Sequence, residues 1–122
     1  MPADVSSRKL ELSFVVETLN LRDAHDFTPL DTALGTLEAQ TLARDRFEIV
    51  VVVDPEAEPE LSRHLAAEWP DVRVLAVPPG THYYAMKNAG AVAARGAVVG
   101  YVDADCQAAP EWAESMCEAL LR

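Results

Sequence analysis

Two aspartates one residue apart, Asp103 and Asp105, are the residues of this sequence whose type and spacing most clearly indicate chemistry. They directly follow an apolar run at residues 97–102 that is typical of a buried β-strand. In an extended chain, residues i and i+2 face the same side, so both carboxylates would face one spot. Two like charges held close need a cation between them, and Mg²⁺ or Mn²⁺ takes such oxygen ligands and joins carboxylates to phosphates. An Asp-x-Asp pair arises often by chance, and its place after a strand is what predicts a divalent metal site.

Polar residues also follow two other apolar runs. Glu17, Thr18 and Asn20 come after one run, and Asp54 comes after the next. Taken singly, each of these residues is explained as a turn or cap residue. Doubly wound α/β sheets bind ligands at the carboxyl ends of their strands, so together these residues form a candidate site.

Four β-branched runs alternate with helical patterns, which is typical of a parallel sheet with crossover helices. Prolines mark the starts of three predicted helices, at Pro29 (with Thr28 as the N-cap), Pro59 and Pro110, and an apolar stripe over residues 85–93 marks another. This order predicts a Rossmann-like α/β fold with three α/β/α layers and a mainly parallel sheet. The predicted strands are residues 12–16, 47–53, 72–77 and 97–102.

Composition and charge limit the possible functions. The chain has 122 residues, 50% of them hydrophobic, which is enough for one domain whose core needs no disulfides. A net charge of −10 would repel a polyanion, so we expect no nucleic-acid partner. No apolar stretch reaches the ~18 residues that span a bilayer, and residues 1–11 form a polar N-terminal segment without a signal-peptide core. Cys106 and Cys117 give no disulfide framework, so we expect a cytoplasmic protein.

Four segments, in order, resemble a known family. They are SFVVETLN at residues 13–20, FEIVVVVD at 47–54, KNAG at 87–90 with ARG at 94–96, and VDAD at 102–105. With these segments the chain resembles the N-terminal, nucleotide-binding half of family 2 glycosyltransferases, which are inverting enzymes with the GT-A fold. The resemblance implies that residues 12–122 are a nucleotide-sugar-binding α/β domain of partial GT-A type, truncated at its C-terminal end.

The resemblance also implies roles for single residues after the first two strands. In the family, the segment after the first strand cradles the nucleobase and ribose, which falls here on Glu17, Thr18 and Asn20. The acid after the second strand binds the base, which would be Asp54.

The remaining implied roles concern the phosphates and the metal. The third helix brings a basic residue and an Asn to the nucleotide, here Lys87 and Asn88. Asp103 would lie near the ribose or a metal-bound water, and Asp105 would ligate Mn²⁺ or Mg²⁺ directly. A protein with a charge of −10 must neutralise a diphosphate locally, and the metal and Lys87 would do so while stabilising the leaving group.

The sequence departs from the family pattern at three places. Glu17 stands where the family usually has Pro, and Lys87 where it often has Arg. Asp54 is followed by Pro55 and Glu56 instead of a second acid and a Gly-Ser turn. These changes affect the identity of the base more than the fold.

We expect a hexosyltransferase-like enzyme that binds a nucleotide-diphosphate sugar and transfers the sugar, with inversion, to an unknown glycan, lipid or small-molecule acceptor. No general base is found in the chain, so it would hold the donor-binding half and could be inactive alone. A non-catalytic nucleotide- or metal-binding domain is the alternative. A receiver-like phosphoacceptor module ranks lower, because it needs an Asp after the third strand, where this chain has Pro78-Pro79-Gly80.

By the family's strand order, residues 97–102 form an exposed edge of the sheet. Because soluble proteins normally avoid such an edge, we expect either that the chain is part of a longer enzyme or that it self-associates.

The remaining candidate side chains are predicted to pack or to be solvated, apart from His82. We expect Cys106 to be a buried small residue and Trp112 to anchor its helix to the sheet. His82 could reach a phosphate. The side chains expected to be solvated are His25, His64, Glu56, Glu58 and Glu60, and those expected to pack are Tyr83 and Tyr84.

Overall fold

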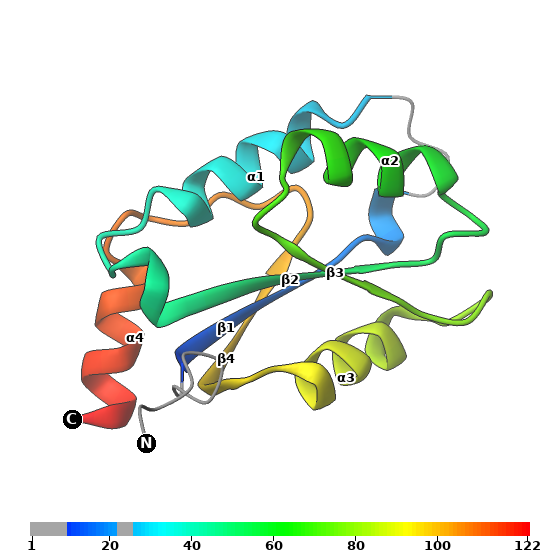
Figure 1. Ribbon diagram of the computed structural model, residues 1–122. Coiled ribbons are helices and arrows are strands. Elements are labelled where there is room, and N and C mark those ends of the chain that lie inside the picture. The colour runs from blue at the N-terminus through cyan, green and yellow to red at the C-terminus, as the bar shows by residue number, and fades with distance from the viewer. Residues whose placement is uncertain (1–9, 22–25) are drawn as a thin grey trace, which may run out of the picture.

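The computed structural model describes residues 10–21 and 26–122 (Figure 1). Its strands are β1 (Leu10–Glu17), β2 (Phe47–Val53), β3 (Arg73–Ala76) and β4 (Gly96–Asp103). Its helices are α1 (Thr28–Glu38), α2 (Pro59–Glu68), α3 (Tyr83–Ala93) and α4 (Trp112–Leu121), with short 3-10 helices η2 (Leu19–Leu21) and η3 (Arg44–Arg46). None of the helices in these ranges is long and apolar enough to cross a membrane.

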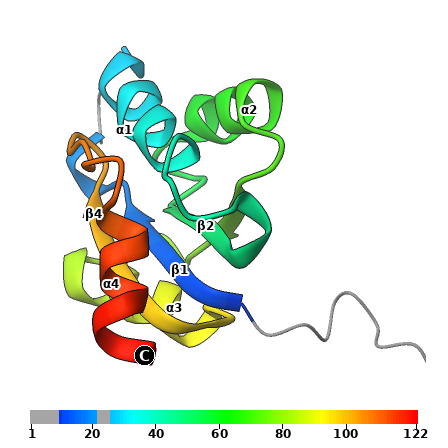
Figure 2. The same ribbon diagram turned by 90° about the vertical axis from the view of Figure 1, so that its left-hand side faces the viewer.

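The strands form one parallel sheet in the order β3-β2-β1-β4. Helices α1 and α2 lie together on one face of this sheet and α3 lies on the other (Figures 1 and 2). The predicted Rossmann-like α/β fold, with a parallel sheet between helical layers, is therefore confirmed. Among the described residues, β4 pairs with β1 alone, so it forms the predicted edge.

Alternate side chains of β1 supply two separate cores. Phe14 and Val16 belong to the larger cluster, which α1, α2 and α4 cover. Val15 points the other way, into a smaller cluster with Val52 and with Met86 of α3. Strands β1 and β2 are buried on both faces, as an apolar run in a central parallel strand predicts.

The strand bounds differ from the predicted ones by a few residues. β1 begins at Leu10, inside the segment expected to be a polar N-terminus, and β3 is two residues shorter than predicted. β4 alternates between buried and exposed residues, with Tyr101 45% exposed, because the strand lies at the edge of the sheet.

The predicted N-cap of α1 is wrong. Phe27 occupies the N-cap position, and Thr28 is the first residue of the helix. The Thr28 hydroxyl instead donates to Asp26 Oδ1 at 2.6 Å.

Two side chains expected to be solvated are instead involved in packing. His64 Nε2 lies 2.6 Å from Asp31 Oδ1, which also accepts a hydrogen bond from Trp69 Nε1, so His64 links α2 to α1. Glu58 is 7% exposed, and its backbone N–H donates to the Asp54 carbonyl at 2.9 Å. The prediction for His64 failed because its partner lies 33 positions away in the sequence. Glu56 and Glu60 are exposed as predicted, and His25 lies outside the described residues.

A buried polar network holds the amino ends of the strands together. The Ser13 hydroxyl donates to Glu48 Oε2 at 2.6 Å and accepts from the Gly96 N–H at 2.8 Å. The same Glu48 oxygen accepts from the Arg95 N–H at 2.7 Å, and Arg73 forms an ion pair with the other oxygen at 3.1 Å. The network fixes the turn between α3 and β4 beside β1.

Gly90 lets α3 approach the sheet closely. A Cβ atom at this position would lie 2.3 Å from Val15 Cγ1 and 3.1 Å from Val52 Cγ2. The helix therefore needs glycine here, although glycine weakens a helix interior.

We expect Gly90→Ala to lower the free energy of unfolding by about 1–3 kcal/mol, because overpacking outweighs the gain in helix propensity. Gly35→Ala in α1 is the matched control, since a Cβ there meets nothing within 4 Å, and it should raise the free energy by up to about 1 kcal/mol. Urea denaturation measures both. Equal stabilisation of the two variants would contradict the close approach of α3.

Candidate functional site

The carboxyl ends of β1, β2 and β4 lie at one edge of the sheet. Glu17, the last residue of β1, pairs with Asp103 of β4 on one side and with Val52 of β2 on the other. Asp54 follows β2 directly. The structure thus brings together the acidic strand ends that the sequence placed far apart.

Glu17 and Thr18 are buried at this edge. Glu17 is 1% exposed, and its Oε2 accepts a hydrogen bond from the Leu19 N–H at 2.9 Å. Burial raises the pKa of Glu17 and the Asp103 carboxylate raises it further, whereas the Leu19 N–H and Lys87 lower it. The Thr18 hydroxyl donates to the Val52 carbonyl at 2.8 Å, so its side chain joins β1 to β2.

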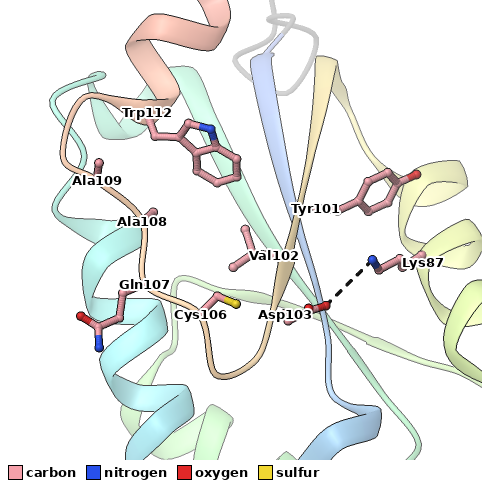
Figure 3. A pocket seen from close by; sticks show the side chains of 9 residues that line it. All are labelled: Lys87, Tyr101, Val102, Asp103, Cys106, Gln107, Ala108, Ala109 and Trp112. Atoms are coloured by element: carbon pink, nitrogen blue, oxygen red, sulfur yellow. Dashed lines mark ion pairs between the residues drawn. The ribbon is translucent and has the colours of Figure 1, made fainter.

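The ammonium group of Lys87 lies beside Asp103. Lys87 Nζ lies 3.9 Å from Asp103 Oδ1 (Figure 3) and 4.3 Å from the centre of the Tyr83 ring. The Tyr83 hydroxyl donates to the same Asp103 oxygen at 3.0 Å. Contact with Tyr83, together with the carboxylates of Asp103 and Glu17, raises the pKa of Lys87, which keeps it charged at neutral pH.

Tyr83 is the residue of this cluster that sequence reasoning missed. It was expected only to pack, yet it hydrogen-bonds the carboxylate of Asp103. The available signal was its four-residue spacing from Lys87, which places both side chains on one face of α3. The neighbouring Tyr84 is 81% exposed, so the prediction that it packs is wrong.

Asp54 is buried, and backbone groups occupy its carboxylate. Oδ1 accepts from the N–H groups of Glu56 at 3.1 Å and Ala57 at 3.2 Å. Oδ2 accepts from the Gly80 N–H at 3.2 Å. The carboxylate therefore faces two loops, and contact with a nucleobase stays a prediction.

Asp105 lies in a turn, not in extended chain. β4 ends at Asp103, and the Cys106 N–H closes the turn on the Asp103 carbonyl at 3.0 Å. The expectation that both aspartates share one strand face is therefore wrong, because the strand ends first. Asp105 is exposed, and the Asp103 side chain is 42% exposed.

The donor set at these two aspartates suits a hard divalent cation that also binds ligand phosphates and water. Within the part of the chain that the structure describes, no cluster of three His, Cys, Asp or Glu residues could hold a metal ion. Asp103 and Asp105 would thus be two carboxylates at most, which is how Mg²⁺ sites on nucleotides are commonly built. Asn20, which follows the carboxyl end of β1, and Asn88, which lies in α3, are both exposed.

A pocket of about 350 Å³ lies beside β4, between Lys87 and Trp112 (Figure 3). The Trp112 ring packs on Phe14 at 5.4 Å between centroids, which confirms that Trp112 anchors α4 to the sheet. Cys106 is exposed at the pocket, so its predicted burial is wrong: it follows the turn that leaves the sheet. His82 is exposed just before α3.

The parallel sheet between helical layers, with polar groups at its carboxyl edge, defines a Rossmann-like α/β domain. The model of glycosyl transferase family 2 matches residues 24–122. The chain belongs to this family, which confirms the resemblance seen in its motifs. No curated protein sequence matches the chain.

Solved structures confirm the GT-A fold. The chain superposes on residues 1–349 of S. aureus TarS with a TM-score of 0.68 and 21% identity, covering 89% of this chain and 32% of that one. TarS 1–349 has been solved in complex with UDP and with UDP-GlcNAc. The mannosyltransferase PcManGT from Pyrobaculum calidifontis, in complex with GDP-Man and Mn²⁺, gives a TM-score of 0.56 and 24% identity over 83% of this chain and 29% of that one. The chain spans about a third or less of the length of these proteins.

We expect Glu17→Gln to stabilise the protein at pH 8. The raised pKa of Glu17 means that its contribution to stability is present at low pH and is lost as pH rises through that pKa. The neutral amide keeps an acceptor for the Leu19 N–H and removes the buried charge. Urea denaturation at several pH values should show an advantage at pH 8 that shrinks as the pH falls through the raised pKa of Glu17 and is gone below the ordinary pKa of 4.5.

Glu56→Gln is the control for this experiment, because Glu56 is exposed at the same edge and should leave stability unchanged. A Glu17→Gln protein less stable than the wild type at pH 8 would show that the charged carboxylate is needed for folding.

Proposed function

We propose that this domain binds a nucleotide-diphosphate sugar at the carboxyl edge of the sheet, through a divalent metal held by Asp103 and Asp105. The observation that carries the proposal is the position of Lys87, whose ammonium lies 3.9 Å from Asp103 at the end of β4. Family membership and the nucleotide sugars named in the TarS and PcManGT structures support it.

Charge explains why a metal and a lysine are both needed. A protein with a net charge of −10 repels a diphosphate at long range, so attraction must come from close cations. Lys87 supplies one fixed point charge, already held by Tyr83. A bound Mn²⁺ or Mg²⁺ would supply the Lewis acid that stabilises charge on the leaving diphosphate.

The proposed nucleotide-binding residues divide by exposure. Asn20, Lys87, Asn88 and Asp103 present side-chain atoms to solvent and would contact ribose and phosphates directly. Glu17, Thr18 and Asp54 are buried at the same edge. The first two would cradle the nucleobase and ribose, and Asp54 would bind the base.

Transfer of the sugar with inversion to a glycan, lipid or small-molecule acceptor completes the proposal. The general base for that step is not assigned to a residue of this chain. The alternative is a non-catalytic nucleotide-binding domain. An assay of UDP-GlcNAc and GDP-Man hydrolysis distinguishes the two, because only an enzyme would hydrolyse these donors.

A cytoplasmic location is part of the proposal, since the exposed free thiol of Cys106 fits a reducing compartment.

Calorimetric titration of UDP, GDP, UDP-GlcNAc and GDP-Man, with MnCl₂ or with EDTA, tests donor binding. We expect binding of at least one nucleotide that depends on the metal. Asp105→Asn should weaken it about ten- to hundred-fold in MnCl₂, because a ligand of the metal is lost. Asp45→Asn, an exposed acid at the opposite end of β2, should change nothing. Absence of binding by the wild type in MnCl₂, and in MgCl₂ as the second metal, would refute the proposal.

We also propose that a second copy of the chain pairs with the free edge of β4. Residues 96–102 carry no charge and no proline, the features that usually protect a strand edge. Light scattering should show a dimer fraction that rises with concentration and falls in Ala97→Lys. Ala66→Lys, an exposed position on α2, is the control. A wild type that stays monomeric at millimolar concentration would contradict this.

A further inference from the structure

We infer that Gln40 is a positioning residue for the proposed metal ligand Asp105, an inference that rests on the proposed function. Gln40 lies two residues after the end of α1 and is buried, with 8% of its surface exposed. Its side-chain amide bonds to the segment that connects β4 with α4, residues 104–111, and to the first turn of α4. This segment, the β4–α4 loop, begins with the turn that carries Asp105.

The amide of Gln40 uses its donor and its acceptor together. Nε2 donates to the Ala109 carbonyl of the loop at 2.7 Å and to the Thr36 carbonyl of α1 at 3.1 Å. Oε1 accepts from the Ala113 N–H at 2.7 Å. Ala113 is the second residue of α4, where an N–H group has no partner within the helix, and the N-cap residue Glu111 makes no side-chain cap. Gln40 thus caps α4 and holds the loop with one side chain.

Two neighbours of Gln40 bind the same loop. The Thr36 hydroxyl accepts from the Ala108 N–H at 3.0 Å. The Thr41 N–H donates to the Pro110 carbonyl at 2.8 Å. Together with the bond from Gln40, each of three consecutive loop residues is therefore tied to the carboxyl end of α1.

The tied residues lie close to the proposed metal site. Asp105 precedes Ala108 by three residues, and the turn from Asp103 to Cys106 joins the loop to the end of β4. Residues 106–109 line the pocket that Asp103 also lines (Figure 3). Because the strand fixes one end of this short segment and α1 fixes the other, the contacts of Gln40 set where the Asp105 carboxylate lies relative to Asp103.

Gln40→Met tests this role, because it keeps an unbranched side chain of similar length and removes the amide donor and acceptor. The Ala113 N–H then loses its partner at a buried position, which is unfavourable. We expect hydrogen exchange of the Ala113 amide to accelerate by about ten-fold or more. The Kd for UDP or GDP with Mn²⁺ should rise by about ten-fold, as for other residues that orient a metal ligand.

Thr36→Val is the second variant. It removes the hydroxyl that accepts from the Ala108 N–H and should also raise the Kd, whereas Thr36→Ser keeps the hydroxyl and should retain the wild-type Kd. Trp69→Phe is the control, because it removes a hydrogen bond to Asp31 in the first turn of α1, at the other end of that helix. It should leave the Kd and the exchange of the loop amides unchanged.

Combination with Asp105→Asn separates positioning from general destabilisation. If Gln40 acts through Asp105, Gln40→Met should raise the Kd no further once Asp105 has lost its charge, so the two substitutions are not additive. An equal fold-change in both backgrounds would overturn the inference, as would an unchanged Kd in Gln40→Met while the wild type binds. A wild type that binds no nucleotide refutes the proposed function and, with it, this role of Gln40, so the two failures are distinguishable.

Discussion

The in-register pairing of β1 with both of its neighbours is the constraint on which the site depends. Because β2 and β4 run parallel to β1, Glu17 ends level with Asp103 on one side and Val52 on the other. This register places two carboxylates side by side. The raised pKa of Glu17, which favours its neutral form, and the cation of Lys87 reduce the repulsion between them.

The distance between α3 and the sheet is the second determinant of the site. Gly90 brings the helix close to Val15, and the Gly80 N–H in the loop that leads into the helix donates to Asp54. Lys87 lies between these two anchor points, so its position is set by packing at one end and hydrogen bonding at the other. The polar network at Glu48 fixes the turn that follows α3, and so the start of β4. Fold and candidate site thus use the same contacts.

The alternation of strands and helices was predictable because apolar periodicity and proline positions are local properties of the chain. The candidate edge was also predictable, since parallel strands end on one side. The predictions that were wrong concern contacts between residues far apart in the sequence or the residue at which a strand ends. His64 pairs with Asp31, 33 positions away, and Asp105 leaves the strand face because β4 ends at Asp103. The role of Tyr83 required knowing that α3 lies beside β4, which its sequence spacing alone does not reveal.

In the proposed function, a divalent metal joins a nucleotide to the end of β4. Paramagnetic broadening by Mn²⁺ in a two-dimensional NMR spectrum of the labelled protein with UDP or GDP tests it most directly. We expect the amides of residues 103–106 and of the first turn of α3 to broaden first, and only when nucleotide is present. Broadening centred instead on exposed acids elsewhere, such as Glu111 and Glu114 of the α4 region, would contradict the account.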